Sequence, residues 1–271
     1  MTAGRRRPRA TTVVALLLGG ALAGCSQLTS DQLFPGACTP FAVVSSTPAD
    51  GADQVPVDTP ISLAFSDFPD PETVGLGTVM LSSGVQTRLG GVAVDLITRS
   101  IRFRIRNRLS ANLSYLVTVL PGVQSMTGCS TKSDQRTFRT GSGPTDPPVP
   151  PAPIPAFSNI LSIFAARCGG AGCHRADDGG DGCLAYPPMG LSLCDRDAWA
   201  ALVNADATEL AGIKRVLPGD PARSYLIRKL VSDPAGGPVP TTPGHRDPPD
   251  APLDDVSLRA ISDWIEGGGA Q

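Results

Sequence analysis

Short apolar runs separated by turn-forming residues fill the first half of the sequence. The runs are four to six residues long and rich in branched and aromatic side chains. In residues 101–106 apolar side chains alternate with arginines, as expected of a strand with one buried face. The pattern predicts an all-β sandwich with strands at residues 41–45, 61–65, 78–81, 92–96, 101–105, 115–120 and 135–138.

In the second half the apolar residues recur at helical spacing. Residues 157–167 place Ile160, Leu161 and Phe164 on one face, as in a helix that packs against a core. Similar patterns predict helices at 195–204, 221–231 and 254–266, and an aspartate near each of these three starts favours the helix dipole. Ser158 is a candidate cap for the first helix. The region is therefore expected to be all-α.

Proline divides the two halves. Seven prolines lie between positions 144 and 155, so residues 142–155 are expected to form an extended linker. We expect an all-β domain at residues 40–141 and an all-α domain at 156–271. A ligand for proline-reading domains is the alternative interpretation of the linker.

The amino-terminal residues are typical of an export signal. Arginines at positions 5, 6, 7 and 9 precede an apolar stretch, 11–22, which is short for a membrane span. Residues 22–25, Leu-Ala-Gly-Cys, resemble the lipobox of bacterial lipoproteins. The resemblance implies cleavage after residue 24, acylation of Cys25 and a short tether over 25–39. Ser26 favours an outer-membrane destination. A plain signal peptide or an uncleaved anchor is the alternative.

Charge argues against nucleic acid as a partner. The chain has 23 basic and 25 acidic residues, and four of the basic ones belong to the signal segment. The remainder has 19 basic residues and a balance of about −6, which repels phosphate backbones. We expect a membrane contact through lipid and a partner protein of unidentified kind.

The most specific chemical motif is Cys168–His174, in which two cysteines are followed at once by a histidine. Covalent haem is held in this way: each thiol adds to a vinyl group and the imidazole binds iron. Four residues rather than two separate Cys168 and Cys173, and the three glycines and one alanine between them can form the required bulge. A small disulfide loop with an incidental histidine is the alternative.

These assignments divide the seven cysteines. Cys25 takes lipid, Cys168 and Cys173 take haem, and export to an oxidising compartment favours disulfides among the rest. The expected pairs are Cys38 with Cys129 and Cys183 with Cys194.

Residues 46–61, 63–66 and 114–119 resemble the bacterial Ig-like domain of exported proteins. The resemblance covers residues 40–141. It implies a spacer or adhesion module and no catalysis.

Residues 168–174, 190–193, 215–221, 224–230 and 253–265 together resemble a small cytochrome c domain over 156–270. The resemblance implies one covalent haem and a methionine as sixth ligand in an Arg-Met-Pro-Pro-like stretch. This chain has Asp247 at that position and Val239 at the other proline-flanked one. We expect that His245 ligates iron or that no residue does so strongly. Met189 is a weaker candidate.

Three functions remain open at this stage. The favoured one is a membrane-anchored electron carrier, more an electron-transfer protein than an enzyme. The second is a haem sensor or peroxide-handling protein with an open sixth site, and the third is a haem-free envelope lipoprotein. An aspartate- and glycine-rich stretch, 177–183, could bind calcium, but a solvated loop closed by Cys183 is the preferred interpretation.

Overall fold

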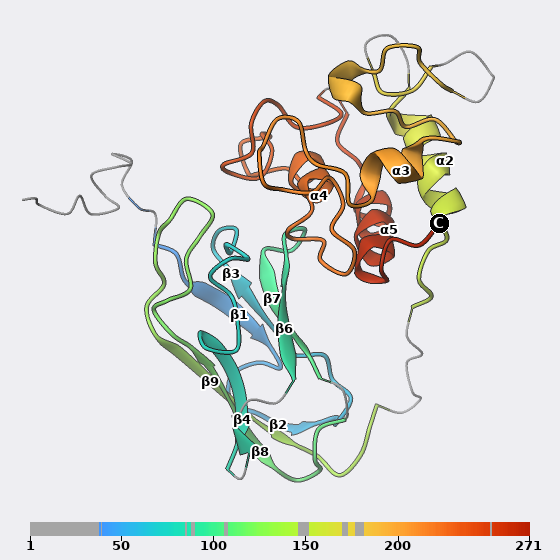
Figure 1. Cartoon of the computed structure of the whole chain (residues 1–271). Coiled ribbons are helices and arrows are strands. Elements are labelled where there is room, and N and C mark those ends of the chain that lie inside the picture. Colours follow the sequence, from blue (N-terminus) through green and yellow to red (C-terminus); the bar gives the residue numbers. More distant parts are fainter. Residues whose placement is uncertain are drawn as a thin grey trace, which may run out of the picture. The chain divides into compact units, whose positions relative to one another are not determined.

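The computed structural model describes residues 38, 40–84, 86–87, 90–105, 108–145, 152–169, 173–176, 182–249 and 251–271 (Figure 1). The predicted signal peptide, the lipidated Cys25 and nearly all of the tether lie outside these residues. So do residues 146–151 of the linker and residues 177–181 of the aspartate-rich stretch.

Nine strands form two sheets between residues 43 and 140. One sheet has the order β1-β3-β7-β6 and the other β2-β9-β8-β4-β5. The strands are β1 Val43–Thr47, β2 Ala52–Val55, β3 Ser62–Phe65, β4 Val79–Ser83, β5 Gln86–Thr87, β6 Gly91–Asp95, β7 Ser100–Arg104, β8 Ser114–Val119 and β9 Asp134–Thr140. All pairings are antiparallel except that of β2 with β9, which is parallel.

Alternating apolar side chains of both sheets form the sandwich core. Leu63 on β3 and Ile101 on β7 are fully buried, as is Val79 on β4. Arg104, three residues beyond Ile101, is exposed, but Arg102 and Phe103 are both half-buried, so the predicted alternation of buried apolar and exposed charged positions is found only in part. The predicted β-sandwich is confirmed by the two sheets. Two strands were missed: β2 has only one buried residue, and β5 is two residues long.

The carboxyl-terminal region has four α-helices and one 3-10 turn: α2 Phe157–Arg167, η1 Pro188–Gly190, α3 Ala198–Leu202, α4 Tyr225–Leu230 and α5 Asp255–Glu266. Helices α2 and α5 pack together, with the rings of Phe157 and Trp264 stacked 5.2 Å apart. Ile160, Ile261 and Trp264 are fully buried between them. Phe164, near the end of α2, is also buried and lines the pocket described below.

The predicted all-α, cytochrome c-like fold of this region is wrong. Helices α3 and α4 have only five and six residues, and most of the region is loop. The predicted helix at 221–231 lacks its first turn. The Tyr225 and Leu226 N–H groups donate to the Lys214 and Arg215 carbonyls and not to carbonyls one turn earlier in the same segment. These donors cannot then point back along a helix, so α4 begins only at Tyr225.

Helix ends followed the predictions in part. The Asp254 carboxylate accepts the Ser257 N–H at 2.8 Å and caps α5, as expected from its position. Helix α2 has the predicted bounds, but its N-cap residue is Ala156, and Ser158 lies inside the helix. The prediction of Ser158 as a cap is therefore wrong.

Both predicted disulfides are confirmed. Cys38 pairs with Cys129 and Cys183 pairs with Cys194. Within the described part of the chain, no helix has the length and apolar character needed to cross a membrane.

The two disulfides close loops of very different length, 91 residues for Cys38–Cys129 and 11 for Cys183–Cys194. Replacing Cys38 and Cys129 together by alanine should lower the free energy of unfolding by about 4–5 kcal/mol, because a long loop restricts the unfolded chain most. Replacing Cys183 and Cys194 should cost about 3 kcal/mol. Urea unfolding of both variants measures the difference. Equal losses, or a larger loss for the short loop, would contradict the chain-entropy argument.

Candidate functional site

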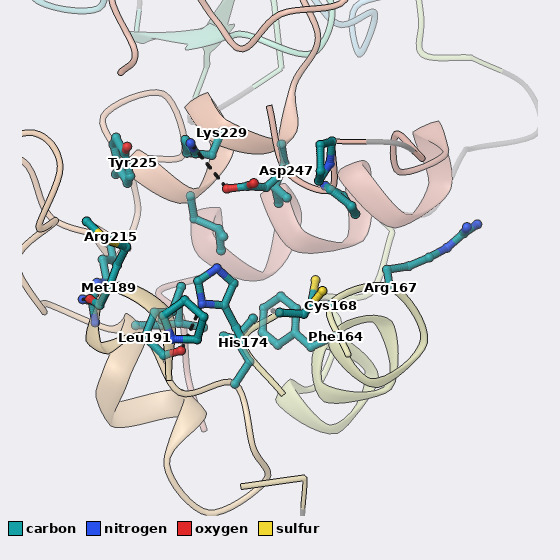
Figure 2. Close-up of a pocket in the computed structure, with 18 of the residues that line it drawn as sticks. Phe164, Arg167, Cys168, His174, Met189, Leu191, Arg215, Tyr225, Lys229 and Asp247 are labelled. Carbon is teal, nitrogen blue, oxygen red and sulfur yellow. Dashed lines mark hydrogen bonds and ion pairs between the residues drawn. The ribbon is translucent and has the colours of Figure 1, made fainter. Parts of the chain in front are cut away.

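A cavity of about 500 Å³ opens between α2, α4 and the loops of the carboxyl-terminal region (Figure 2). Its lining is mainly apolar and includes Phe164, Leu191, Leu193, Leu202, Leu226 and Leu230. Apolar cavities of this size, with a few polar groups at their edge, are typical sites for small molecules and cofactors.

Cys168, Cys173 and His174 all line this cavity, as does His245. The four residues that the sequence marked as candidates for haem binding therefore lie around one cavity in the fold. Val239, the other residue considered at a proline-flanked position, is fully buried and is not among the lining residues.

The segment 191–193 holds His174 in place. Nδ1 of His174 lies 3.2 Å from the Leu191 carbonyl oxygen, and the Leu193 N–H donates to the His174 carbonyl at 3.0 Å. Because a carbonyl oxygen can only accept, Nδ1 carries the proton. Nε2 is then the ring nitrogen with a free lone pair, which is the arrangement found in histidines that ligate metals.

Cys168 and Cys173 form no disulfide in the structure, and both are partly buried. Cys168 follows the end of α2, where its N–H donates to the Phe164 carbonyl at 2.8 Å. Burial raises the pKa of the Cys168 thiol to about 12, and the neighbouring negative charges of Cys173 and Asp247 act in the same direction. The thiol is therefore neutral at physiological pH, which disfavours a role in thiol–disulfide exchange.

The potential ligand atoms of Cys168, Cys173 and His174 are too far apart to bind one metal ion together. Among the described residues, the only group of three metal-binding side chains with donor atoms within 4.8 Å of one another is Cys183, Cys194 and Asp197. The sulfurs of that group form a disulfide. The donor atoms of Cys168, Cys173 and His174 do not gather in this way, although all three residues line one cavity. Separate attachment points suit a large group better than a bare ion.

Across the cavity from His174 lies a chain of charged groups (Figure 2). Lys229 on α4 is buried, with 7% of its side chain exposed, and its ammonium lies 3.5 Å from Asp247 and 3.6 Å from Glu209. Nε2 of His245 lies 3.4 Å from Asp247, and 72% of the His245 side chain is exposed. His245 is thus held at the cavity edge by Asp247.

Tyr225 extends this polar edge. Its hydroxyl donates to Glu209 at 2.7 Å, and this hydrogen bond, aided by Lys229, lowers the pKa of Glu209. Burial and the Glu209 carboxylate raise the pKa of Tyr225 in turn. Glu209 is therefore the ionised partner and Tyr225 the neutral donor.

Met189 belongs to the His174 side of the cavity. It adopts φ +50°, which is uncommon for a residue with a side chain, and its carbonyl accepts from Arg215 at 3.0 Å and from Thr208 at 3.1 Å. Figure 2 shows Met189 next to Arg215 and away from Asp247. Two bonds to one carbonyl hold the turn that leads into Leu191.

Sequence reasoning missed Arg215, Lys229 and Tyr225. Residues 215–221 and 224–230 were used for a resemblance, and 221–231 also for a predicted helix, but no site role was assigned to these three side chains, since a basic residue in a helix is usually solvated. The signal that could have found Lys229 is its helical spacing: it lies four residues after Tyr225, and both face the cavity.

Comparisons with known proteins bear on the sandwich. Residues 37–140 match the family model described as bacterial Ig-like domain, so the Ig-like part of the prediction is confirmed. No curated protein matches the chain.

Similar solved structures include the N-terminal part of the bacterial S-layer protein SbsC, with 15% identity and a TM-score of 0.32 over 43% of this chain and 26% of that one. CopC from Methylosinus trichosporium OB3b has 13% identity and a TM-score of 0.32 over 39% of this chain and 97% of that one. LD transpeptidase LdtMt1 in complex with imipenem has 19% identity and a TM-score of 0.29, over 38% and 40%. At such scores these similarities carry no argument about function.

The raised pKa of Cys168 leads to a prediction for the full chain made without haem. Only the thiolate reacts with iodoacetamide, so at pH 8 Cys168 should be alkylated at least about a hundredfold more slowly in the folded chain than in the urea-unfolded chain. Peptide-resolved mass spectrometry measures both rates. Similar rates in the two states would contradict the burial of this thiol.

The same pKa shift predicts how stability depends on pH. The folded-state pKa of about 12 exceeds the ordinary thiol pKa of 9.0, so the native state retains a proton that the unfolded chain loses. The free energy of unfolding should therefore be insensitive to this thiol below about pH 9 and should fall as the pH rises toward 12. Cys168→Ala should flatten the slope in this window in urea titrations, and an unchanged slope would argue against the shift.

Proposed function

We propose that this protein is an exported Ig-like protein that binds one haem covalently through Cys168 and Cys173, with His174 as an iron ligand. When bound, haem would supply redox chemistry or an open iron site for a small ligand. The proposal concerns the cavity and its residues and does not require a cytochrome c fold.

One observation carries the proposal: the hydrogen bond from His174 Nδ1 to the Leu191 carbonyl, 3.2 Å, in a cavity that also contains two reduced cysteines. Such a bond fixes the tautomer that leaves Nε2 able to bind iron.

The remaining residues fit a haem. The cavity is large enough for a cofactor and its apolar lining suits the porphyrin face, while the positive charge of Arg215 suits a carboxylate substituent. The spread of the donor atoms also suits a group held at several points.

The face opposite His174 favours a weakly held or open sixth position. His245 is mostly exposed and is drawn to Asp247, and Met189 lies on the His174 side. Lys229 is paired with two carboxylates, so its ammonium has no free lone pair to offer. We therefore propose ligand sensing or peroxide handling over simple electron transfer. Electron transfer becomes the preferred function if His245 is found to bind iron.

Haem attachment is testable on the exported protein. The denatured wild-type chain should retain one haem by intact mass and should give a pyridine haemochrome spectrum. Cys168→Ser with Cys173→Ser should abolish both signals, because no thioether can form. The matched control, Cys183→Ser with Cys194→Ser, removes the neighbouring disulfide and should keep the haem. A wild-type mass equal to polypeptide plus lipid would exclude the proposal.

The sixth position has its own prediction. Wild-type ferric protein should be high-spin and should bind cyanide or carbon monoxide readily, with His245→Ala unchanged. Absorption and electron paramagnetic resonance spectra measure the spin state. A low-spin wild type that becomes high-spin in His245→Ala would instead establish histidine ligation, and a near-infrared sulfur band would identify Met189.

Export and anchoring remain part of the proposal. Residues 22–25 motivate lipid attachment at Cys25, with the protein in the outer membrane facing the periplasm or the cell surface. Stable anchoring needs more than one acyl chain, and in this proposal all of them are attached to Cys25. Cys25→Ala should therefore release the protein from the membrane fraction. Immunoblots of membrane and soluble fractions measure the change, and full retention of the variant in the membrane would contradict lipid anchoring.

A haem-free structural role in the envelope is the second candidate. It is favoured by the match of residues 37–140 to the bacterial Ig-like family, since such domains commonly act as spacers or adhesion modules. This role predicts a disulfide between Cys168 and Cys173 in the exported protein. The mass measurement above distinguishes it from haem attachment, because a disulfide lowers the mass by two hydrogens.

A further inference from the structure

The far wall of the cavity is a proline-rich loop that runs from Gly236 to Pro249. Four residues of this loop line the cavity: His245, Asp247, Pro248 and Pro249. Prolines have no N–H group, so this stretch cannot hold itself together by a ladder of backbone hydrogen bonds.

Arg246 supplies the missing donors. Its side chain is buried, with the residue 7% exposed, and its guanidinium donates to three carbonyls. Nη1 bonds Pro248 at 2.7 Å, Nη2 bonds Pro249 at 2.9 Å and Nε bonds Gly236 at 3.4 Å. One planar side chain thus ties the end of the loop to its beginning.

Arg246 is buried behind the cavity wall, and the residues on either side of it, His245 and Asp247, face the cavity. His245 is exposed, Arg246 is buried and Asp247 is half-buried, and only the two neighbours line the cavity. The Asp247 N–H donates to the Lys229 carbonyl at 2.9 Å, and Lys229 Nζ donates to the Pro243 carbonyl at 3.3 Å. The loop is therefore fixed to Lys229 of α4 on both sides of Arg246, and Arg246 itself bonds the start of the loop at Gly236.

We propose that Arg246 is the positioning residue that fixes the far wall of the cavity and so limits the size of ligand admitted opposite His174. The inference rests on the proposed function in one respect: the ligand would be a small molecule that reaches the haem. Arg246 does not line the cavity, so it acts through Asp247, Pro248 and Pro249.

The test compares Arg246→Lys with a matched control, Arg228→Lys, in the exported full-length protein. Arg228 is also buried, and its guanidinium also donates to a backbone carbonyl, that of Ala222 at 3.2 Å. The loop bonds only the backbone carbonyl of Arg228, from the Val239 N–H at 3.1 Å, and this contact does not involve the side chain that is replaced. Lysine keeps the positive charge in both variants but lacks the planar guanidinium that donates to several carbonyls at once. Cyanide and imidazole are the ligand probes, one small and one bulky.

Arg246→Lys should keep its haem, bind imidazole at least about tenfold more tightly than wild type and bind cyanide within about threefold of wild type. Hydrogen exchange in the peptide 236–249 should become faster at the same time. Arg228→Lys should reproduce any loss of thermal stability without changing the ratio of imidazole to cyanide affinity.

An unchanged ligand ratio in Arg246→Lys, or an equal change in Arg228→Lys, would overturn the inference. A wild-type chain without haem would defeat the proposed function alone, because hydrogen exchange in the loop still tests Arg246. Slow, wild-type exchange in Arg246→Lys would then overturn its role in the wall as well.

Discussion

The cavity depends on arginine side chains that hold backbone carbonyls. Its walls are loops with few helical or strand hydrogen bonds, so many carbonyls need donors from elsewhere. Arg175, Arg215 and Arg246 supply them, to the carbonyls of Leu193, of Met189, Gly190 and Ala201, and of Gly236, Pro248 and Pro249. A hydrogen bond from a charged donor contributes about 1.5–3 kcal/mol, enough to define a loop that has no regular structure.

These arginine contacts organise the two sides of the cavity differently. Arg215 holds the turn that enters Leu191, and Leu191 orients His174. Arg246 holds the opposite wall, which carries Asp247 next to Lys229. One side therefore presents the His174 imidazole, whose Nδ1 is bonded to a backbone carbonyl, and the other presents paired charges. This asymmetry is what a cofactor with one protein ligand and one reactive face requires.

Local patterns in the sequence accounted for the sandwich and for α2. Strand alternation at Ile101 and helical spacing at Ile160 and Phe164 both reflect burial of one face, which neighbouring residues in the sequence reveal. The disulfides followed from counting cysteines once the other roles were assigned. The segment β2 was missed because it pairs in parallel with β9 and buries little of its surface.

Non-local hydrogen bonds explain the errors in the carboxyl-terminal region. The spacing in 221–231 suggested a long helix, but the N–H groups of Tyr225 and Leu226 bond the carbonyls of Lys214 and Arg215. The thiols and both histidines of the cavity were predicted because their chemistry is recognisable in a short motif or by elimination. Arg246 was read only as part of a departure from a family pattern, since nothing in the sequence shows that its partners are the carbonyls of prolines.

Locating the cofactor on the chain tests the central claim most directly. Proteolysis of the denatured exported protein, followed by separation of peptides with detection at the haem absorption band, should find all haem on the peptide that contains Cys168, Cys173 and His174. Fragmentation of that peptide should place both thioether bonds on the two cysteines. The same peptide found without haem, with a disulfide between Cys168 and Cys173, would contradict the account.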